Sequence, residues 1–210
     1  MAERITGLYR AIRLPAVYKG LMFALGADNA IRRYVNEVMT PAPGIKMLDV
    51  GCGPANVLAY LPSLDYTGID HNENHIAFAR QLYGSRGRFI VGSADQLQQD
   101  GNSFDLINVS AILHHLEDGQ AKAMFKSLKP LLKDNGKITT IDNVWLPAQR
   151  AVVKLINNLD SGMNIRTPEG YLGLLSGLGF DVQPRVFHDL LHVPYDHFVM
   201  VARHGAMSVS

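Results

Sequence analysis

Gly51 and Gly53 are separated by one residue and stand directly after an apolar run that ends at Val50. Because glycine has no Cβ, two glycines at a strand-to-helix turn let a ligand lie against bare backbone. The segment 56–61 that follows has helical periodicity, and the first N–H groups of such a helix would face the same point. This pattern is typical of a nucleotide-binding turn.

Two carboxylates narrow the choice of nucleotide. Asp70 ends a strand-like run over 66–70, about twenty residues beyond the glycines, which is the spacing of a ribose-binding acid. A NAD-binding dehydrogenase would share this much, but Asn56 stands where the third glycine of its fingerprint would be. Asp49, just ahead of the turn, would repel a pyrophosphate. A cationic ligand without phosphate, such as S-adenosylmethionine (SAM), would tolerate it.

Further segments follow in a fixed order along the chain. They are Leu48-Asp-Val-Gly-Cys-Gly-Pro-Ala55, Gly68-Ile-Asp70, Gly92-Ser-Ala-Asp95, Phe104-Asp-Leu-Ile-Asn-Val-Ser110 with Ile112-Leu-His-His-Leu116, and Leu128-Lys-Pro-Leu-Leu-Lys-Asp-Asn-Gly136. In this order they resemble the motifs of the class I SAM-dependent methyltransferases, small-molecule type, across residues 44 to 142. One departure is Ala55, which replaces the last glycine of the first motif.

The resemblance implies SAM as the cofactor, S-adenosylhomocysteine as the product, and a site beyond the carboxyl ends of the strands. In it Asp70 would hold the ribose diol, and Asp95 would accept a hydrogen bond from adenine. A simpler alternative is that Asp49 interacts only with a helix dipole, and that Asp70 and Asp95 only cap helices. The residues expected to contact the cofactor are Asp49, Gly51, Cys52, Gly53, Asp70, His71, Ala94, Asp95, Gln96 and Ser110.

His114 and His115 are the candidate catalytic residues, since imidazole titrates near neutral pH. Methyl transfer is an in-line displacement that depends on positioning, and a general base helps when the acceptor must lose a proton. Both histidines follow the predicted fourth strand, on the loop that would face the methyl group. Because successive residues of an extended loop point apart, at most one should face the substrate. The alternative is that both are structural.

Four residues are candidates for binding the acceptor. Arg166 could pair with an acidic substrate group, or it could tie its own loop to Asp160. His192 and Tyr195 would form a pocket rim, and Tyr18 would reach the site from an N-terminal lid. No metal is expected, because the His188-x-x-x-His192 spacing has no helical signature around it.

The elements that must position these residues alternate along the chain. Helical patterns fill 1–39, a Pro- and Gly-rich breaker follows at 40–44, and Asn72 and Thr167 are predicted helix caps. The predicted strands are 45–50, 66–70, 88–92, 104–109, 137–142, 180–187 and 196–203. Such alternation predicts an α/β fold with a doubly wound, mostly parallel sheet and helices on both faces. The resemblance adds that the sheet has seven strands, the last antiparallel. We expect one domain with a helical lid at 1–43, a SAM-binding core at 44–142, and substrate-side helices and a closing hairpin at 143–210.

Composition excludes several classes of protein. A hydrophobic content of 47% argues against disorder, and a net charge of +1 gives no basic footprint for nucleic acid. Cys52 is the only cysteine, which favours a cytoplasmic location, and no run is long and apolar enough to span a membrane. The sequence allows peripheral membrane contact through the basic N-terminal helices. It is compatible with a monomer and with a homodimer.

Two absences complete the functional prediction. The Asn/Asp-Pro-Pro-Tyr/Phe run of the enzymes that methylate amino groups of nucleic-acid bases is missing, because Asn108-Val-Ser-Ala111 stands there. There is also no Pro-Cys nucleophile for cytosine methylation. The sequence therefore predicts an enzyme that methylates an oxygen, nitrogen or carbon atom of a small molecule. The alternative is a SAM-binding regulatory or partner protein without transfer activity.

Overall fold

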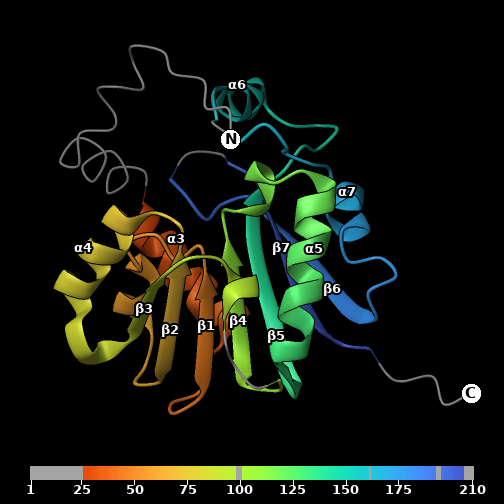
Figure 1. Ribbon diagram of the computed structural model, residues 1–210. Helices are drawn as coiled ribbons and strands as arrows, with labels where there is room; N and C mark the ends of the chain where they lie inside the picture. The colour runs from red at the N-terminus through yellow and green to blue at the C-terminus, as the bar shows by residue number, and fades with distance from the viewer. Residues whose placement is uncertain (1–25, 98–100, 161, 193–194, 206–210) are drawn as a thin grey trace, which may run out of the picture.

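The computed structural model describes residues 26–97, 101–160, 162–192 and 195–205. Their centre is one seven-stranded sheet in the order β3-β2-β1-β4-β5-β7-β6 (Figure 1). Strand β7 is antiparallel to both of its neighbours, and the other pairings are parallel, so the predicted fold class is confirmed. The strands are β1 Lys46–Val50, β2 Asp65–Asp70, β3 Arg88–Val91, β4 Phe104–Ser110, β5 Leu132–Asn143, β6 Phe180–Phe187 and β7 His197–His204.

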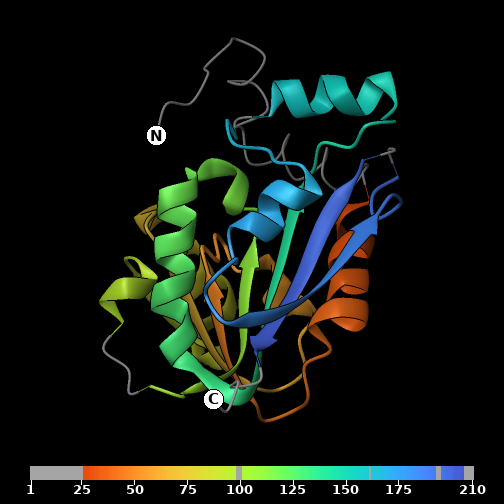
Figure 2. The same ribbon diagram turned by 90° about the vertical axis from the view of Figure 1, so that its right-hand side faces the viewer.

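Helices cover both faces of this sheet. Helices α5 and α7 lie on one face and α3 lies on the other, while α6 crosses above the carboxyl ends of the parallel strands (Figure 2). The α-helices are α3 Ala27–Tyr34, α4 Glu73–Tyr83, α5 Asp118–Leu128, α6 Ala151–Leu159 and α7 Pro168–Gly173. Helix α3 continues into a π-helical turn, Val35–Met39. In the described part of the chain, no helix is both long and apolar enough to cross a bilayer.

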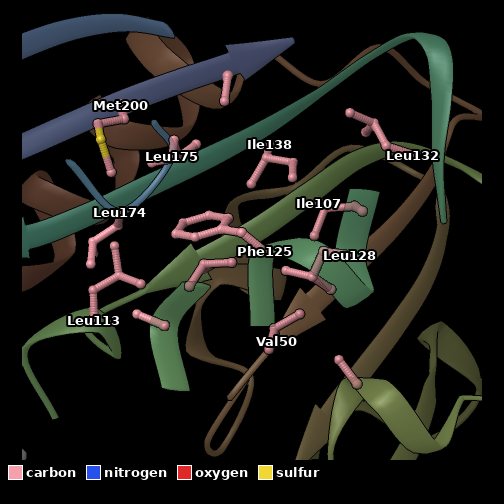
Figure 3. Close-up of a cluster of buried hydrophobic side chains, with 14 of the residues drawn as sticks. Val50, Ile107, Leu113, Phe125, Leu128, Leu132, Ile138, Leu174, Leu175 and Met200 are labelled. Carbon is pink, nitrogen blue, oxygen red and sulfur yellow. The ribbon is translucent and has the colours of Figure 1, made fainter. Parts of the chain in front are cut away.

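The core follows from the alternation of side chains along the central strands. In β1, Leu48 and Val50 belong to the cluster under α5 and α7, whereas Met47 belongs to the cluster on the opposite face. Figure 3 shows the first cluster, in which the buried ring of Phe125 from α5 lies among aliphatic side chains such as Ile138 of β5. Burial of each large apolar side chain contributes about 1.5–3 kcal/mol to the free energy of folding. This packing keeps the strands, and therefore their ends, in fixed register.

The two predicted helix caps are present. The side chain of Asn72 accepts hydrogen bonds from the backbone N–H groups of Asn74 (2.9 Å) and His75 (3.4 Å) at the start of α4. Thr167 accepts one from Gly170 N (3.3 Å) at the start of α7. Each cap gives orphan N–H groups of a first helical turn a partner, which fixes where the helix begins.

The helical segment predicted over 56–61, after the glycine turn, ends one residue earlier than expected. It is a single 3₁₀ segment, Asn56–Tyr60. Leu61 ends it in an extended conformation (φ −85°, ψ 146°), because Pro62 disfavours the helical region for the residue before it. The turn is therefore shaped mainly by its own backbone, including the left-handed conformation of Ala55 (φ 57°).

Candidate active site

A cavity of about 740 Å³ opens at the carboxyl ends of β1, β4 and β5. Strand β1 lies between β2 and β4, so the chain leaves β1 toward one side of the sheet and later returns on the other. The crevice at such a switch point is the usual ligand site of an open α/β sheet. The volume lies within the range of small-molecule pockets. Helix α3 forms another wall through Ala27, Ala30, Ile31 and Tyr34.

The glycine turn lines this cavity through Gly51 and Cys52. Gly51 and Gly53 have φ values of +62° and +53°, a region that L side chains rarely adopt. A Cβ on Gly51 would collide with the side chain of Ile112, whereas one on Gly53 would meet only His75 Nδ1, at 3.9 Å. Bare backbone is therefore required at Gly51, and space is open beside Gly53.

Cys52 packs inward rather than serving as a reactive thiol. A Cβ added to Gly68 on the neighbouring strand would lie 2.8 Å from Cys52 Sγ, so the thiol fills the space that glycine leaves. Burial raises the pKa of the Cys52 thiol, which keeps it protonated and poorly nucleophilic.

Asp70 braces the same turn. Its Oδ2 accepts a hydrogen bond from Gly53 N (2.8 Å) and its Oδ1 accepts one from Asn72 N (2.8 Å). The carboxyl group is buried, yet each oxygen retains capacity for another donor. Asn72, not Asp70, caps α4, so the capping alternative does not describe this acid.

Asp49 is the centre of a buried polar network on the cavity wall. It accepts hydrogen bonds from Tyr66 Oη (2.6 Å) and Asn108 Nδ2 (2.7 Å). Asn108 Oδ1 in turn accepts from Tyr34 Oη (2.9 Å) and Ser110 Oγ (3.0 Å), which ties α3 to the sheet. Burial raises the pKa of Asp49 to about 6, against the lowering effect of its hydrogen bonds. An adjacent cation would favour its ionised form.

The residues predicted to surround adenine lie at the ends of β2 and β3 and do not line the cavity. Ala94–Gln96 form one 3₁₀ turn, whose Gln96 side chain accepts a hydrogen bond from Ser93 N (3.1 Å). Asp95 is exposed, and its Oδ1 accepts a hydrogen bond from Ser93 Oγ (2.5 Å). His71 is also exposed, with Nδ1 3.7 Å from Asp70 Oδ1.

Of the two candidate catalytic histidines, only His114 lines the cavity. A 3₁₀ turn, Leu113–His115, follows β4 and turns His114 inward, where 5% of the residue is exposed. His114 Nδ1 lies 2.7 Å from Asp142 Oδ1, and Nε2 lies 3.6 Å from Asp160 Oδ1. The His115 ring packs against that of His114, with centroids 4.1 Å apart. The arrangement leaves Nε2 as the nitrogen directed toward Asp160 on the cavity wall.

Polar atoms at the end of β5 and the start of β7 add to this wall. Asp142 Oδ2, Asn143 Oδ1 and His197 Nδ1 are buried and have no hydrogen-bond partner among the described residues. Burial raises the pKa of Asp142 and lowers that of His197 to about 4, so His197 is neutral at pH 7. Asn143 Nδ2 donates to Tyr195 Oη (2.8 Å) on the same wall. Buried polar atoms without partners are uncommon, and these three belong to residues that line the cavity.

Sequence reasoning singled out Tyr195 but missed Asp142, Asn143 and Asp160 as cavity residues beside the histidines. Asp142 ends the predicted fifth strand, 137–142, and Asn143 follows it as the last residue of the observed β5. Polar residues at a strand end are the signal that could have found them.

Arg166 does not line the cavity. Its guanidinium donates to Leu113 O (2.7 Å) and Leu116 O (2.7 Å), and it pairs with Asp118 rather than Asp160. The side chain therefore holds the turn that carries His114, which leaves it no role in pairing with an acceptor in this cavity.

The other predicted acceptor residues have separate places. His192 lines a neighbouring cavity of about 950 Å³, and a Cβ added to Gly26 would lie 2.7 Å from its ring. Tyr18 lies outside the described residues. Within the described ranges, no group of three potential ligands is arranged to hold a metal ion.

Comparisons with known proteins agree with this geometry. Residues 47–136 match a family model described as a methyltransferase domain. The chain is 28% identical over 176 residues to phosphoethanolamine N-methyltransferase 3 of Arabidopsis thaliana, covering 81% of this chain and 35% of that protein. It is 22% identical over 170 residues to a ubiquinone/menaquinone biosynthesis C-methyltransferase of Shewanella oneidensis, covering 76% of this chain and 66% of the relative. The chain thus spans about a third to two thirds of the length of these relatives.

A solved structure with the same fold is geranyl diphosphate C-methyltransferase from Streptomyces coelicolor A3(2), determined with Mg²⁺, geranyl diphosphate and S-adenosyl-L-homocysteine. The TM-score is 0.68 at 13% identity, with 84% of this chain and 79% of that chain covered. The domain match over residues 47–136, the curated relatives and the shared seven-stranded sheet show that this chain contains a methyltransferase domain with the fold of the SAM-dependent methyltransferases.

Proposed function

We propose that this protein transfers the methyl group of SAM to a small-molecule acceptor, with His114 as the general base. The observation that carries the proposal is the buried His114–Asp142 pair, 2.7 Å apart, on the wall of a cavity at the switch point of the sheet.

The residues present at the turn fit SAM. Gly51 provides bare backbone, Asp49 provides a buried carboxylate for a cationic ligand, and Asp70 has acceptor capacity beside the turn. When bound, SAM supplies a methyl carbon that is already activated by a sulfonium leaving group. The protein must therefore bind the cofactor, orient the acceptor and remove a proton.

Asp142 supports His114 in the last of these tasks. A hydrogen bond from Nδ1–H to Asp142 Oδ1 fixes the tautomer in which Nε2 carries the lone pair. His114 can then accept a proton at Nε2, and the carboxylate stabilises the imidazolium that forms. A positioned general base of this kind contributes typically about 10²–10⁴-fold in rate.

Arg166 is a positioning residue for this base. Its hydrogen bonds to Leu113 O and Leu116 O bracket the 3₁₀ turn on both sides of His114. Ile31 of α3 and Ile156 of α6 also line the cavity, and their apolar side chains would exclude water from the reacting atoms.

The test combines binding with turnover. Calorimetric titration with S-adenosylhomocysteine should show binding to the wild-type protein and weaker binding to Asp70→Ala. A screen of small-molecule acceptors with isotopically labelled SAM should then detect transfer, and His114→Asn should slow it without changing the affinity for S-adenosylhomocysteine.

The possible outcomes separate three readings. A folded protein that fails to bind either SAM or S-adenosylhomocysteine would contradict the proposal. Binding without transfer to any acceptor would favour a regulatory SAM-binding protein. Full activity of His114→Asn would show that His114 is not the general base, but it would not contradict the transferase function.

A further inference from the structure

We propose that the acceptor is an amine with an apolar body, bound as its ammonium ion at the Asp142–Asp160 side of the cavity. This inference rests on the proposed transfer function and names the class of its substrate.

The charges on the cavity wall are the first support. Among the described residues that line it, Asp49, Asp142 and Asp160 are acids, and there is no lysine or arginine. Arg166 is bonded to carbonyl oxygens and to Asp118 outside the cavity. His197 is neutral at pH 7, because burial lowers its pKa to about 4. Among the described lining residues, an anionic acceptor would find no lysine or arginine, whereas a cation would find carboxylates.

Unpartnered acceptor atoms are the second and independent support. Asp142 is 2% exposed and its Oδ2 has no donor among the described residues, although Oδ1 is bonded to His114. Asn143 Oδ1, on the same wall, is a second buried acceptor without a donor. An ammonium group has three donors and no acceptor, so it complements atoms of this kind better than a hydroxyl or a carboxylate.

The position of Asp160 is the third support. Its Oδ1 accepts a hydrogen bond from Gly162 N (2.6 Å), which fixes the carboxylate just beyond α6. The separation of 3.6 Å from His114 Nε2 is longer than a good hydrogen bond. Two carboxylates thus bracket one imidazole, and an ammonium near Asp160 would bring a positive charge to this acidic cluster.

The same residues complete the chemistry. His114 Nε2 takes one proton from the ammonium, which frees the nitrogen lone pair. That lone pair forms the new N–C bond to the methyl carbon as the C–S bond breaks. The electron pair of the broken C–S bond remains on sulfur. The products are an N-methylated ammonium, S-adenosylhomocysteine and a proton on His114, which Asp142 stabilises until solvent removes it.

The rest of the wall indicates what the amine is attached to. Ile31, Ile141 and Leu190 are apolar, and the rings of Tyr34 and Tyr195 lie on the same cavity. These side chains suit a hydrocarbon or aromatic body, and an aromatic face also attracts a nearby cation.

The experiment uses three probes of nearly equal shape: benzylamine, benzyl alcohol and benzoate. Each is titrated calorimetrically at pH 7 into the full chain saturated with S-adenosylhomocysteine. We expect benzylamine to bind at least about tenfold more tightly than the alcohol, with benzoate the weakest. Asp160→Asn keeps the shape of the site but removes one charge, so the preference for the amine should fall several-fold.

The matched control is Asp134→Asn, an exposed acid near the opposite end of β5, which should leave the preference unchanged. Equal or tighter binding of the alcohol or benzoate would overturn the inference. So would failure of benzylamine to bind, or an unchanged preference in Asp160→Asn. Failure to bind S-adenosylhomocysteine is a separate observation, and it would contradict the transferase function itself.

Discussion

The imidazole of His114 and the carboxylate of Asp142 lie 2.7 Å apart, although 28 positions separate them in the sequence. The parallel pairing of β4 with β5 brings them together, because its register sets Ser110 beside Ile141. His114 follows the end of β4 and Asp142 is the next residue of β5. The pair therefore depends on the register of two buried central strands.

Replacing His114 with asparagine should lower kcat by about 10²–10⁴-fold, because the proton of the acceptor loses its base. His115→Asn is the matched control, since His115 does not line the cavity, and it should change kcat little. Steady-state turnover with a saturating acceptor is the measurement, together with S-adenosylhomocysteine affinity for each variant. Equal losses in the two variants would assign the effect to packing of the two rings.

Asp49 should make stability and cofactor binding depend on pH in opposite directions. Its pKa is about 6 in the folded chain against 3.8 for a free carboxyl, so its folded-state pKa is raised. Its contribution to the free energy of unfolding is fully present below pH 4 and is lost as pH rises through 6. The loss is at most about 3 kcal/mol. Cationic SAM should restore this loss by pairing with the ionised form.

Denaturant unfolding between pH 4 and 7, with and without SAM, measures both effects. In Asp49→Asn the part of the fall that Asp49 causes should disappear, while the part due to Asp142, whose pKa burial also raises, should remain. The stabilisation by SAM should become independent of pH over this range. A wild-type affinity for SAM that weakens from pH 5 to 7 would contradict the prediction.

His197 should act in the other sense. Burial lowers its pKa to about 4 from 6.5, so the unfolded chain binds its proton first. Its contribution to the free energy of unfolding is present above pH 6.5 and is lost as pH falls toward 4. The loss amounts to about 2 kcal/mol at pH 5. Comparing His197→Gln with the wild type in the Asp49→Asn background isolates this term. A difference between the two proteins that is the same at pH 7 and pH 5 would exclude it.

Arg166→Lys should lower kcat while leaving S-adenosylhomocysteine affinity unchanged. A lysine cannot bond to Leu113 O and Leu116 O at once in the planar geometry of a guanidinium. Lost hydrogen bonds to buried carbonyls should also reduce stability by about 1–3 kcal/mol. Arg185→Lys, at an exposed pair with Glu37, is the control.

The readout that separates positioning from mere destabilisation is the kcat value measured well below the unfolding temperature. A kcat equal to that of the wild type, with only lower thermal stability, would show that Arg166 supports the fold alone.

Much of the fold follows from local patterns in the sequence. Continuous apolar runs, separated along the chain by helical patterns, predicted the strands. Such runs are expected because each central strand buries both of its faces in a doubly covered sheet. The glycine turn and Asp70 were also predictable, since a fixed short spacing in a β-α-β unit sets their separation. The 3₁₀ form of the segment after the turn was not predicted, because apolar spacing over so few residues does not distinguish a 3₁₀ turn from an α-helix.

The choice between His114 and His115 could not be made from the sequence, since both residues have the same type and the same local context. The tertiary structure distinguishes them, because it is His114 that bonds to Asp142 on a neighbouring strand. In the same way, Arg166 donates hydrogen bonds to Leu113 O and Leu116 O and does not pair with Asp160. The sequence by itself determined which elements form and which strand ends carry polar groups. Only the tertiary structure decided which of those groups meet, because hydrogen bonds between distant residues depend on strand register and packing rather than on spacing along the chain.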